Sequence, residues 1–177
     1  MIFYPKAYLN KVTDIDLEFL RQRNIKGLLI DIDNTLITKD GRVIENLEEW
    51  AKKLREEGKI KLCILSNTNK KEKAKKMSEV LKAEYYIYFA KKPLKFGFNK
   101  AKKKLNLENE NIAVVGDQML TDVLGANRSK MYSILVKPLE EKDIFITRFN
   151  RMIEKRILET TNLIKQGNKS VNLYKHN

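Results

Sequence analysis

The chain has 177 residues, 42% of them hydrophobic and 33% charged, a composition typical of a globular domain with a sizeable core. Its single cysteine, Cys63, excludes an internal disulfide, and its single histidine, His176, stands next to the end, which disfavours histidine-based triads and histidine metal sites. The formal charge of +13 attracts anions, so nucleic acid, acidic lipid surfaces and phosphorylated molecules are candidate partners.

The chain shows no sign of export or of membrane insertion. No apolar run approaches the roughly 20 residues of a transmembrane helix, and the first residues lack the apolar stretch of a secretory signal. One cysteine fits a reducing compartment. We therefore expect a cytoplasmic protein without a transmembrane segment, with peripheral contact at the inner face of the membrane as an option.

The lead segment, residues 1–24, contains a predicted helix at 15–22, capped by Asp14 or Thr13. From Lys26 onward, short apolar runs alternate with helical patterns. The predicted strands are 27–32, 60–65, 85–89, 112–116 and 132–136, and the predicted helices between them are 47–57, 70–82, 97–105 and 121–127. This alternation predicts an α/β fold, a Rossmann-like, doubly wound parallel sheet.

The last part of the chain predicts an amphipathic helix at 141–165, followed by a loose polar tail at 166–177. Its apolar residues recur at every fourth position, at Phe145, Phe149, Ile153 and Ile157. This stripe favours packing on the core over contact with lipid. We expect a single domain over 1–165, with 26–136 as its core.

Polar groups follow the predicted strands, where open α/β sheets bind their ligands. They are Asp31 and Asp33 after the first strand, Ser66 and Asn67 after the second, Lys91 and Lys92 after the third, and Asp117 and Asp122 after the fourth. A single such residue is more often a cap or a loop residue. A set at four successive strand ends predicts one site.

Three carboxylates of this set, Asp31, Asp33 and Asp117, predict a site for a hard cation. Alternate residues of an extended strand point the same way, so Asp31 and Asp33 face one place if the strand continues that far. Carboxylates that converge without histidine favour Mg²⁺ when phosphate is present. Ser66 and Lys92 then supply a donor and a positive charge to a phosphoryl group. Lys92 is preferred to Lys91 because Pro93 restricts its backbone, but the alternative stays open.

These residues resemble the motifs of the haloacid dehalogenase (HAD) superfamily of phosphatases over about 26–136. The motifs are Asp31-Ile32-Asp33-Asn34-Thr35, Ser66, Lys92, and Gly116-Asp117 with Asp122. The resemblance implies that Asp31 attacks phosphorus to form an aspartyl-phosphate and that Asp33 is the general acid and base. It implies Mg²⁺ on the side chains of Asp31 and Asp117 and on the backbone carbonyl of Asp33, with Asp122 in support. The implied phosphate-binding residues are Asn34, Thr35, Ser66, Asn67 and Lys92.

The flanking segments extend the resemblance to about 1–160. The lead segment, AKKP, GDQMLTDVLGANR and TRFNRMIEKRIL are similar to the YqeG group of subclass IIIA, which is similar to mitochondrial phosphatidylglycerophosphate phosphatases. This similarity implies an anionic phospholipid headgroup as substrate. The spacings from Thr35 to Ser66 and from Ser66 to Lys92 leave no room for a cap domain, which suits a phosphate on a large substrate.

Other interpretations of the sequence either keep the phosphatase chemistry with another substrate or give the protein no catalytic activity. A phosphoprotein, a nucleotide or a nucleic-acid end is an alternative substrate, because lysines cluster at 70–76 and 100–104. A basic nucleic-acid-binding protein without activity is a remote alternative, since every expected catalytic group is present. A receiver domain is disfavoured because its phosphate-accepting aspartate ends the third strand, where this chain has Phe89 and Ala90.

Overall fold

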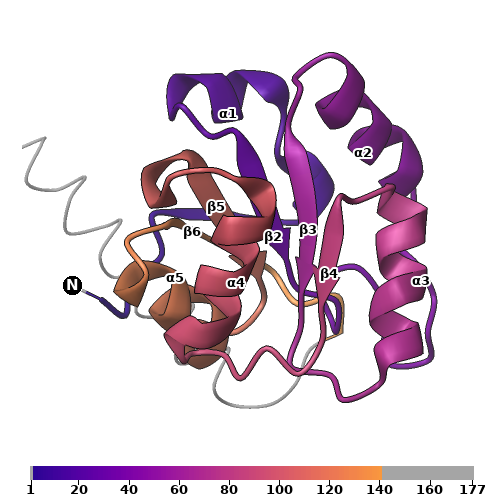
Figure 1. Ribbon diagram of the computed structural model, residues 1–177. Coiled ribbons are helices and arrows are strands. Elements are labelled where there is room, and N and C mark those ends of the chain that lie inside the picture. Colours follow the sequence, from indigo (N-terminus) through magenta and orange to yellow (C-terminus); the bar gives the residue numbers. More distant parts are fainter. Residues whose placement is uncertain (1, 141–177) are drawn as a thin grey trace, which may run out of the picture. The chain divides into compact units, whose positions relative to one another are not determined.

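The computed structural model describes residues 2–140, and these residues form a parallel sheet of six strands with helices on both faces (Figure 1). The strand order is β1-β6-β5-β2-β3-β4. The strands are β1 (Ala7–Leu9), β2 (Gly27–Ile30), β3 (Lys61–Leu65), β4 (Tyr85–Ile87), β5 (Ile112–Gly116) and β6 (Tyr132–Val136). The α-helices are α1 (Leu17–Gln22), α2 (Leu47–Glu56), α3 (Lys71–Leu81), α4 (Lys95–Leu105) and α5 (Leu124–Arg128). Short helical turns lie at η1 (Val12–Asp14) and η2 (Asn109–Asn111), and η3 (Met119–Val123) is a π-helix.

The central strands are apolar on both faces because helices cover both. In β2, Leu28 and Ile30 pack with residues of α1, α2 and α3, whereas Leu29 packs on the other side with residues of α4 and α5. All four residues of β2 are buried. The predicted α/β fold with a doubly wound parallel sheet is confirmed.

The connections beside the central strands are short, as predicted for a fold without a cap domain. The chain from β2 to β3 forms a loop with two isolated bridges and then α2, and the chain from β3 to β4 forms α3. No further domain is inserted between residues 31 and 94, all of which the structure describes.

The lead segment differs from its prediction in two ways. The sequence pattern did not predict β1, a three-residue edge strand that pairs in parallel with β6. The predicted cap of the first helix is wrong, because Asp14 closes the η1 turn by accepting a hydrogen bond from Lys11 N. Asp16 is the cap of α1, and its Oδ1 accepts from Phe19 N at 2.7 Å.

Several elements end or begin at other residues than predicted. β2 ends at Ile30 rather than at residue 32, although Asp31 N still donates to Val115 O of β5 at 2.9 Å. The chain then turns through Asn34, which has a φ of 61°. β4 ends at Ile87 rather than at 89, and α4 begins at Lys95 rather than at 97. The helix predicted at 121–127 is divided between η3 and α5.

Two predictions concern the membrane and the end of the chain. No helix in the described part of the chain is long and apolar enough to cross a membrane. The predicted amphipathic helix at 141–165 and the polar tail at 166–177 lie outside the described residues, so they stay predictions, as does the domain boundary at 165.

Candidate active site

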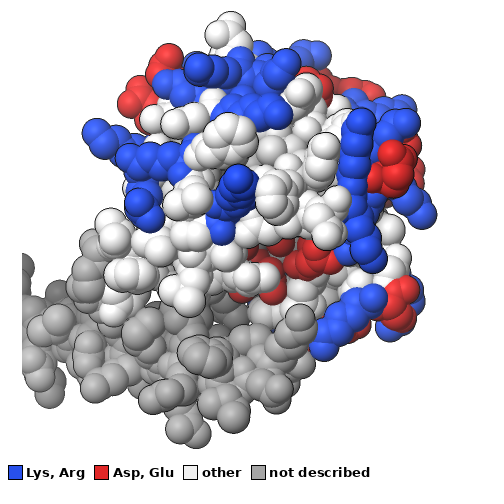
Figure 2. All heavy atoms as spheres, turned by 60° about the horizontal axis from the view of Figure 1, so that its bottom comes forward, with Lys and Arg blue, Asp and Glu red and all other residues white. Residues whose placement is uncertain are grey.

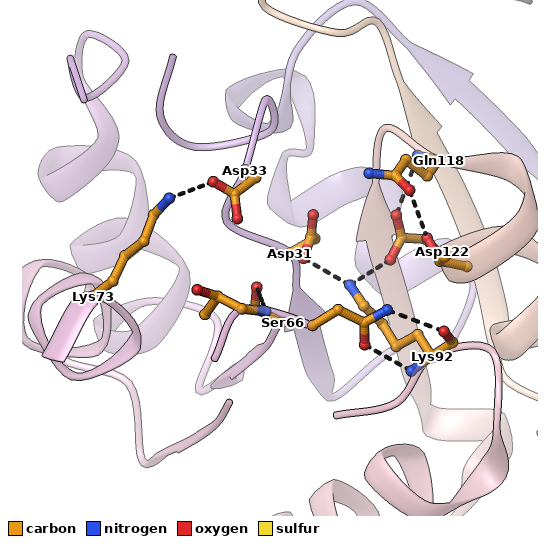
Figure 3. Close-up of polar contacts among 10 residues, drawn as sticks. Asp31, Asp33, Ser66, Lys73, Lys92, Gln118 and Asp122 are labelled. Carbon is orange, nitrogen blue, oxygen red and sulfur yellow. Dashed lines mark hydrogen bonds and ion pairs between the residues drawn. The ribbon is translucent and has the colours of Figure 1, made fainter. Parts of the chain in front are cut away.

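An acidic hollow opens at the edge of the sheet where the strands end (Figure 2). Its centre is an ion-paired cluster of Asp31, Lys92 and Asp122 (Figure 3). Lys92 Nζ donates to Asp31 Oδ1 at 2.7 Å and to Asp122 Oδ1 at 2.6 Å. All three residues are at most 6% exposed. Residues from three separate strand ends therefore meet in one buried network, as parallel strands make possible.

The inward position of Lys92 follows from the hydrogen bonds of Asn67. Asn67 Oδ1 accepts from Lys92 N at 2.7 Å, and its Nδ2 donates to Lys92 O at 3.0 Å. Lys91 is exposed, with Nζ 5.2 Å from the centre of the Phe89 ring. The structure thus brings Lys92, and not Lys91, to the aspartates. Asn67 lies beside the site with its amide engaged by this backbone, and its predicted contact with phosphate stays a prediction.

Asp117 completes a group of three carboxylates. One oxygen from each of Asp31, Asp117 and Asp122 lies within 4.8 Å of the other two. Asp117 Oδ1 is buried and has no hydrogen-bond partner among the described residues. Asp122 Oδ2 accepts from Gln118 N at 3.1 Å, so both oxygens of Asp122 are engaged. Asp31 and Asp117 are therefore the members with oxygens left for a ligand.

Gly116 allows Asp122 to lie against the end of β5. A Cβ at this position would be 2.2 Å from Asp122 Oδ2 and 2.3 Å from its Cγ, closer than atoms can approach. Any larger residue would displace the carboxylate from Lys92. A glycine is therefore required at position 116 of the Gly116-Asp117 motif for steric reasons within the fold, independently of any contact with substrate.

Burial and charge set the protonation of this cluster. Burial raises the pKa of Asp31 to about 7, with Lys92 opposing this rise and Asp122 adding to it. Burial also raises the pKa of Asp117 to about 6, and the charge of Asp122 adds to the effect. Burial lowers the pKa of Lys92, but Asp122 and Asp31 outweigh it, so the pKa is raised and the ammonium stays charged. One lysine does not neutralise three carboxylates, so the site favours a further cation.

Asp33 is not a member of the group of three converging carboxylates, because β2 ends at Ile30 and the extended strand does not continue to Asp33. The strand ends at Ile30, and the carboxylate of Asp33 forms an ion pair with Lys73 of α3 (Figure 3). Its side chain is 50% exposed. The three carboxylates that converge are thus Asp31, Asp117 and Asp122, whereas the Asp33 side chain borders the hollow. The predicted use of the Asp33 backbone carbonyl as a metal ligand stays a prediction.

The remaining predicted phosphate-binding residues lie around the same strand ends. Asn34 Nδ2 donates to Asp117 Oδ2 at 3.3 Å, and its Oδ1 accepts from Glu140 N at 2.8 Å. Thr35 is buried, and its hydroxyl has no hydrogen-bond partner in the described structure. Ser66 is also buried, and its Oγ accepts from Thr68 N at 3.2 Å. These contacts fix the loops, and the roles of the side chains in binding phosphate stay predictions.

Three residues of the site region were not found from the sequence. Lys73 is one of several lysines in α3, and only the rotation of the helix selects it for Asp33. Gln118 contributes through its backbone N–H, which any residue has. Glu140 also contacts Asn34 through its backbone, with its oxygen accepting from Asn34 Nδ2 at 3.1 Å. Residue types carry no signal for such backbone contacts.

The donor set fits Mg²⁺. Hard oxygen ligands from carboxylates suit this ion, and the described residues bring no histidine or thiol to the site. The unpaired, buried Oδ1 of Asp117 is the observation that a bound cation would explain. Asp31 and Asp117 would hold the ion, and Asp122 would orient the cluster from behind.

The sequence also matches a family of known proteins. The family model described as mitochondrial PGP phosphatase matches residues 1–139. The chain belongs to this family. It is therefore a phosphatase, and the resemblance to YqeG is confirmed.

Individual relatives agree with this assignment. The "Probable phosphatase YqeG" of Bacillus subtilis (strain 168) is 43% identical over 157 residues, which is 88% of this chain and 90% of that protein. An uncharacterized protein from Listeria monocytogenes serotype 4b has the same fold at 19% identity, with a TM-score of 0.55 over 68% of this chain and 85% of that chain. Another, from Corynebacterium glutamicum, is 19% identical with a TM-score of 0.51 over 75% and 93% of the two chains.

Proposed function

We propose that the protein is a magnesium-dependent phosphomonoesterase that forms an aspartyl-phosphate on Asp31 and releases phosphate from phosphatidylglycerophosphate. The observation that carries the chemistry is the pairing of Asp31 Oδ1 with the buried Lys92 ammonium. Within the described residues, no hydrogen bond uses Oδ2 of Asp31. One oxygen is thus held in place, and the other is available to attack phosphorus.

The first step transfers the phosphoryl group to the protein. Asp31 Oδ2 forms a bond to phosphorus while the bond from phosphorus to the glycerol oxygen breaks. Asp33, protonated and released from its ion pair with Lys73 when the substrate enters, gives its proton to that leaving oxygen. The Lys92 ammonium and the Ser66 hydroxyl stabilise the charge that develops on the phosphoryl oxygens.

The second step removes phosphate from Asp31. Water attacks the phosphorus and gives its proton to Asp33, inorganic phosphate leaves, and both carboxyl groups return to their starting states. The half-exposed position of Asp33 at the edge of the hollow gives it access both to a leaving alcohol and to water. Mg²⁺ bound by Asp31 and Asp117 would neutralise the charge of the carboxylates and the substrate phosphate.

The proposal of a lipid substrate rests on the family and on the form of the site. The matching family is named for PGP, which we take as phosphatidylglycerophosphate. The connections after β2 and β3 insert no cap domain, so the hollow does not enclose a small molecule. A phosphate that projects from a bilayer is therefore a suitable substrate.

Phosphate release from vesicles that contain phosphatidylglycerophosphate tests this proposal. We expect release that requires Mg²⁺, that EDTA stops and that Asp31→Asn abolishes. Asp40→Asn is the matched control, because Asp40 is an exposed loop aspartate. A purified enzyme that leaves this lipid intact and hydrolyses a phosphoprotein, a nucleotide or a nucleic-acid end would overturn the lipid substrate and retain the chemistry.

A further inference from the structure

The exposed apolar side chains concentrate at the edge of the sheet that carries the active site. The large hydrophobic residues exposed in the described structure are Ile2, Phe3, Tyr8, Val43, Tyr88, Phe89, Leu94, Phe96 and Leu120. All but the first three lie in chain segments that follow the carboxyl end of β2, β4 or β5. A patch of this kind on a protein surface is a sign of an interaction site.

The densest group lies between β4 and the first turn of α4. We call Tyr88, Phe89, Leu94 and Phe96 the aromatic rim, and their exposed fractions are 40%, 55%, 54% and 62%. A groove of about 440 Å³ is lined by Tyr88, Phe89 and Phe96 of this rim, by the three residues of β4, and by Lys71 and Lys100. The exposed aromatic rings and the side chain of Leu94 do not pack in the hydrophobic core, since they face solvent.

Positive charge surrounds the aromatic rim. The segment 85–107 contains seven lysines and no aspartate or glutamate. Lys92 turns inward to the active site, whereas Lys91, Lys95 and Lys100 are exposed around the rim. Figure 2 shows uncharged surface and blue lysines beside the red hollow. Peripheral proteins bind anionic bilayers through exposed apolar side chains surrounded by lysines. The methylene chains of the lysines lie in the membrane interface, and their ammonium groups contact the lipid phosphates.

The rim is tied closely to the active site. Phe89 N donates to Thr68 O at 2.8 Å, and Ala90 N donates to Ser66 O at 2.9 Å. Lys92, three residues beyond Phe89, contacts Asp31. The rim and the active-site lysine therefore belong to one loop, which is fixed by its backbone to the residues that follow β3.

We infer that the aromatic rim and its lysines dock the protein on an anionic phospholipid bilayer, with the acidic hollow facing the lipid headgroups. This inference rests on the proposed function, and it names the surface by which the site reaches a substrate within a membrane. The rings alone would also suit stacked nucleic-acid bases. Leu94 is about as exposed as Phe89, but it has no aromatic ring that could stack on a base. Its transfer from water to the bilayer interface is favourable, so a bilayer is favoured over nucleic acid.

Flotation of the full chain with vesicles tests the inference. Phosphatidylcholine vesicles are compared with vesicles that also contain phosphatidylglycerol, for the wild type, the double variant Leu94→Ser/Phe96→Ser and the double variant Lys91→Ala/Lys95→Ala. We expect binding only with the anionic lipid, and a loss of about tenfold or more in each variant. Activity on p-nitrophenyl phosphate stays within about twofold of wild type, since none of the four side chains touches the reacting groups.

Matched controls lie elsewhere on the chain. Phe3→Ser removes an aromatic side chain that is 50% exposed. Phe3 precedes β1, which lies at the opposite edge of the sheet from β4. Lys52→Ala/Lys53→Ala removes two exposed lysines of α2, on the other face of the sheet from α4. Vesicle binding that falls no further in the rim variants than in these controls would overturn the inference. Loss of binding to a single-stranded oligonucleotide in the rim variants, without vesicle binding by the wild type, would also overturn it.

Failure of the docking surface can be distinguished from failure of the proposed function. Vesicle binding that depends on the rim, with no release of phosphate from phosphatidylglycerophosphate, would remove that substrate and leave the docking surface in place. Release from this lipid presented in detergent micelles, with vesicle binding independent of the rim, would support the substrate and remove the docking surface.

Discussion

Lys92 lies between two buried aspartates and donates to both, to Asp31 at 2.7 Å and to Asp122 at 2.6 Å. Asp31 is the proposed nucleophile, and Asp122 is anchored by Gln118 N. The lysine therefore connects the reacting carboxylate to a fixed point of the fold. It also supplies the positive charge that a dianionic substrate needs beside a carboxylate.

Replacement of Lys92 tests this relationship. Lys92→Met leaves Asp31 and Asp122 without their common partner, and we expect the free energy of unfolding to fall by about 3 kcal/mol. We also expect turnover of p-nitrophenyl phosphate to fall by about a hundredfold or more, since a preorganised charge at the phosphoryl group is lost. Urea unfolding and steady-state kinetics measure the two effects.

The control is Lys91→Met, which changes the adjacent, exposed lysine. We expect unchanged stability and activity toward the same soluble substrate. Equal losses in the two variants would contradict the assignment of the active-site lysine.

Binding of Mg²⁺ distinguishes the carboxylates. We expect Mg²⁺ to raise the Tm of the wild type, because it relieves the repulsion within the group of three aspartates. Asp117→Asn removes a charged ligand and should abolish the shift. Asp33→Asn should retain the shift, because its side chain pairs with Lys73 outside this group. Differential scanning fluorimetry with and without EDTA measures the shifts, and a shift lost in Asp33→Asn but kept in Asp117→Asn would refute this metal site.

Lys73 holds the proposed acid and base at the edge of the hollow. The pair is partly exposed, so we expect Lys73→Met to change the free energy of unfolding by less than about 1 kcal/mol. We expect kcat to fall by about tenfold, since Asp33 loses the contact that orients it. Lys76→Met, an exposed position of the same helix, should leave kcat unchanged. An unchanged kcat in Lys73→Met would show that the pair has no part in catalysis.

Cys63 gives a prediction for alkaline pH. Burial in β3 raises the pKa of its thiol to about 12, and the charge of Glu84 adds to the rise. The folded protein thus binds this proton more tightly than the unfolded chain does. The resulting stability is fully present below the thiol's ordinary pKa of 9.0 and is lost as pH rises from there toward about 12.

We therefore expect iodoacetamide to label the urea-unfolded protein readily at mildly alkaline pH and the native protein slowly. The free energy of unfolding should also fall more steeply above pH 9 in the wild type than in Cys63→Ala. Rapid labelling of the native thiol would contradict its burial.

The order of elements and the chemistry of the strand ends could be predicted because both depend on residue types. The apolar runs in β2, β3 and β5 are covered on both faces, so their pattern is nearly continuous, and the polar residues that follow them stand out. This is why Asp31, Ser66 and Asp117 were found at the carboxyl edge. β1 was missed because three residues at a sheet edge, none of them buried, carry little pattern.

The detailed geometry depended on features that residue types do not show. β2 ends at Ile30, so the alternation of an extended strand does not continue through Asp31 and Asp33, and this early end is not visible in the sequence. Asp122 entered the buried cluster because η3 and Gly116 bring it against β5. Lys92 rather than Lys91 points into the site because the side-chain amide of Asn67 forms hydrogen bonds with both the N–H and the carbonyl of Lys92.

The claim on which the account depends is that Asp31 carries the phosphoryl group during turnover. Mass spectrometry of enzyme quenched in acid while it hydrolyses phosphatidylglycerophosphate in the presence of Mg²⁺ tests it most directly. We expect a phosphate on the peptide that contains Asp31, absent when EDTA is added and absent in Asp31→Asn. An active enzyme that shows no phosphate on this peptide, together with an Asp31→Asn variant that keeps its activity, would contradict it.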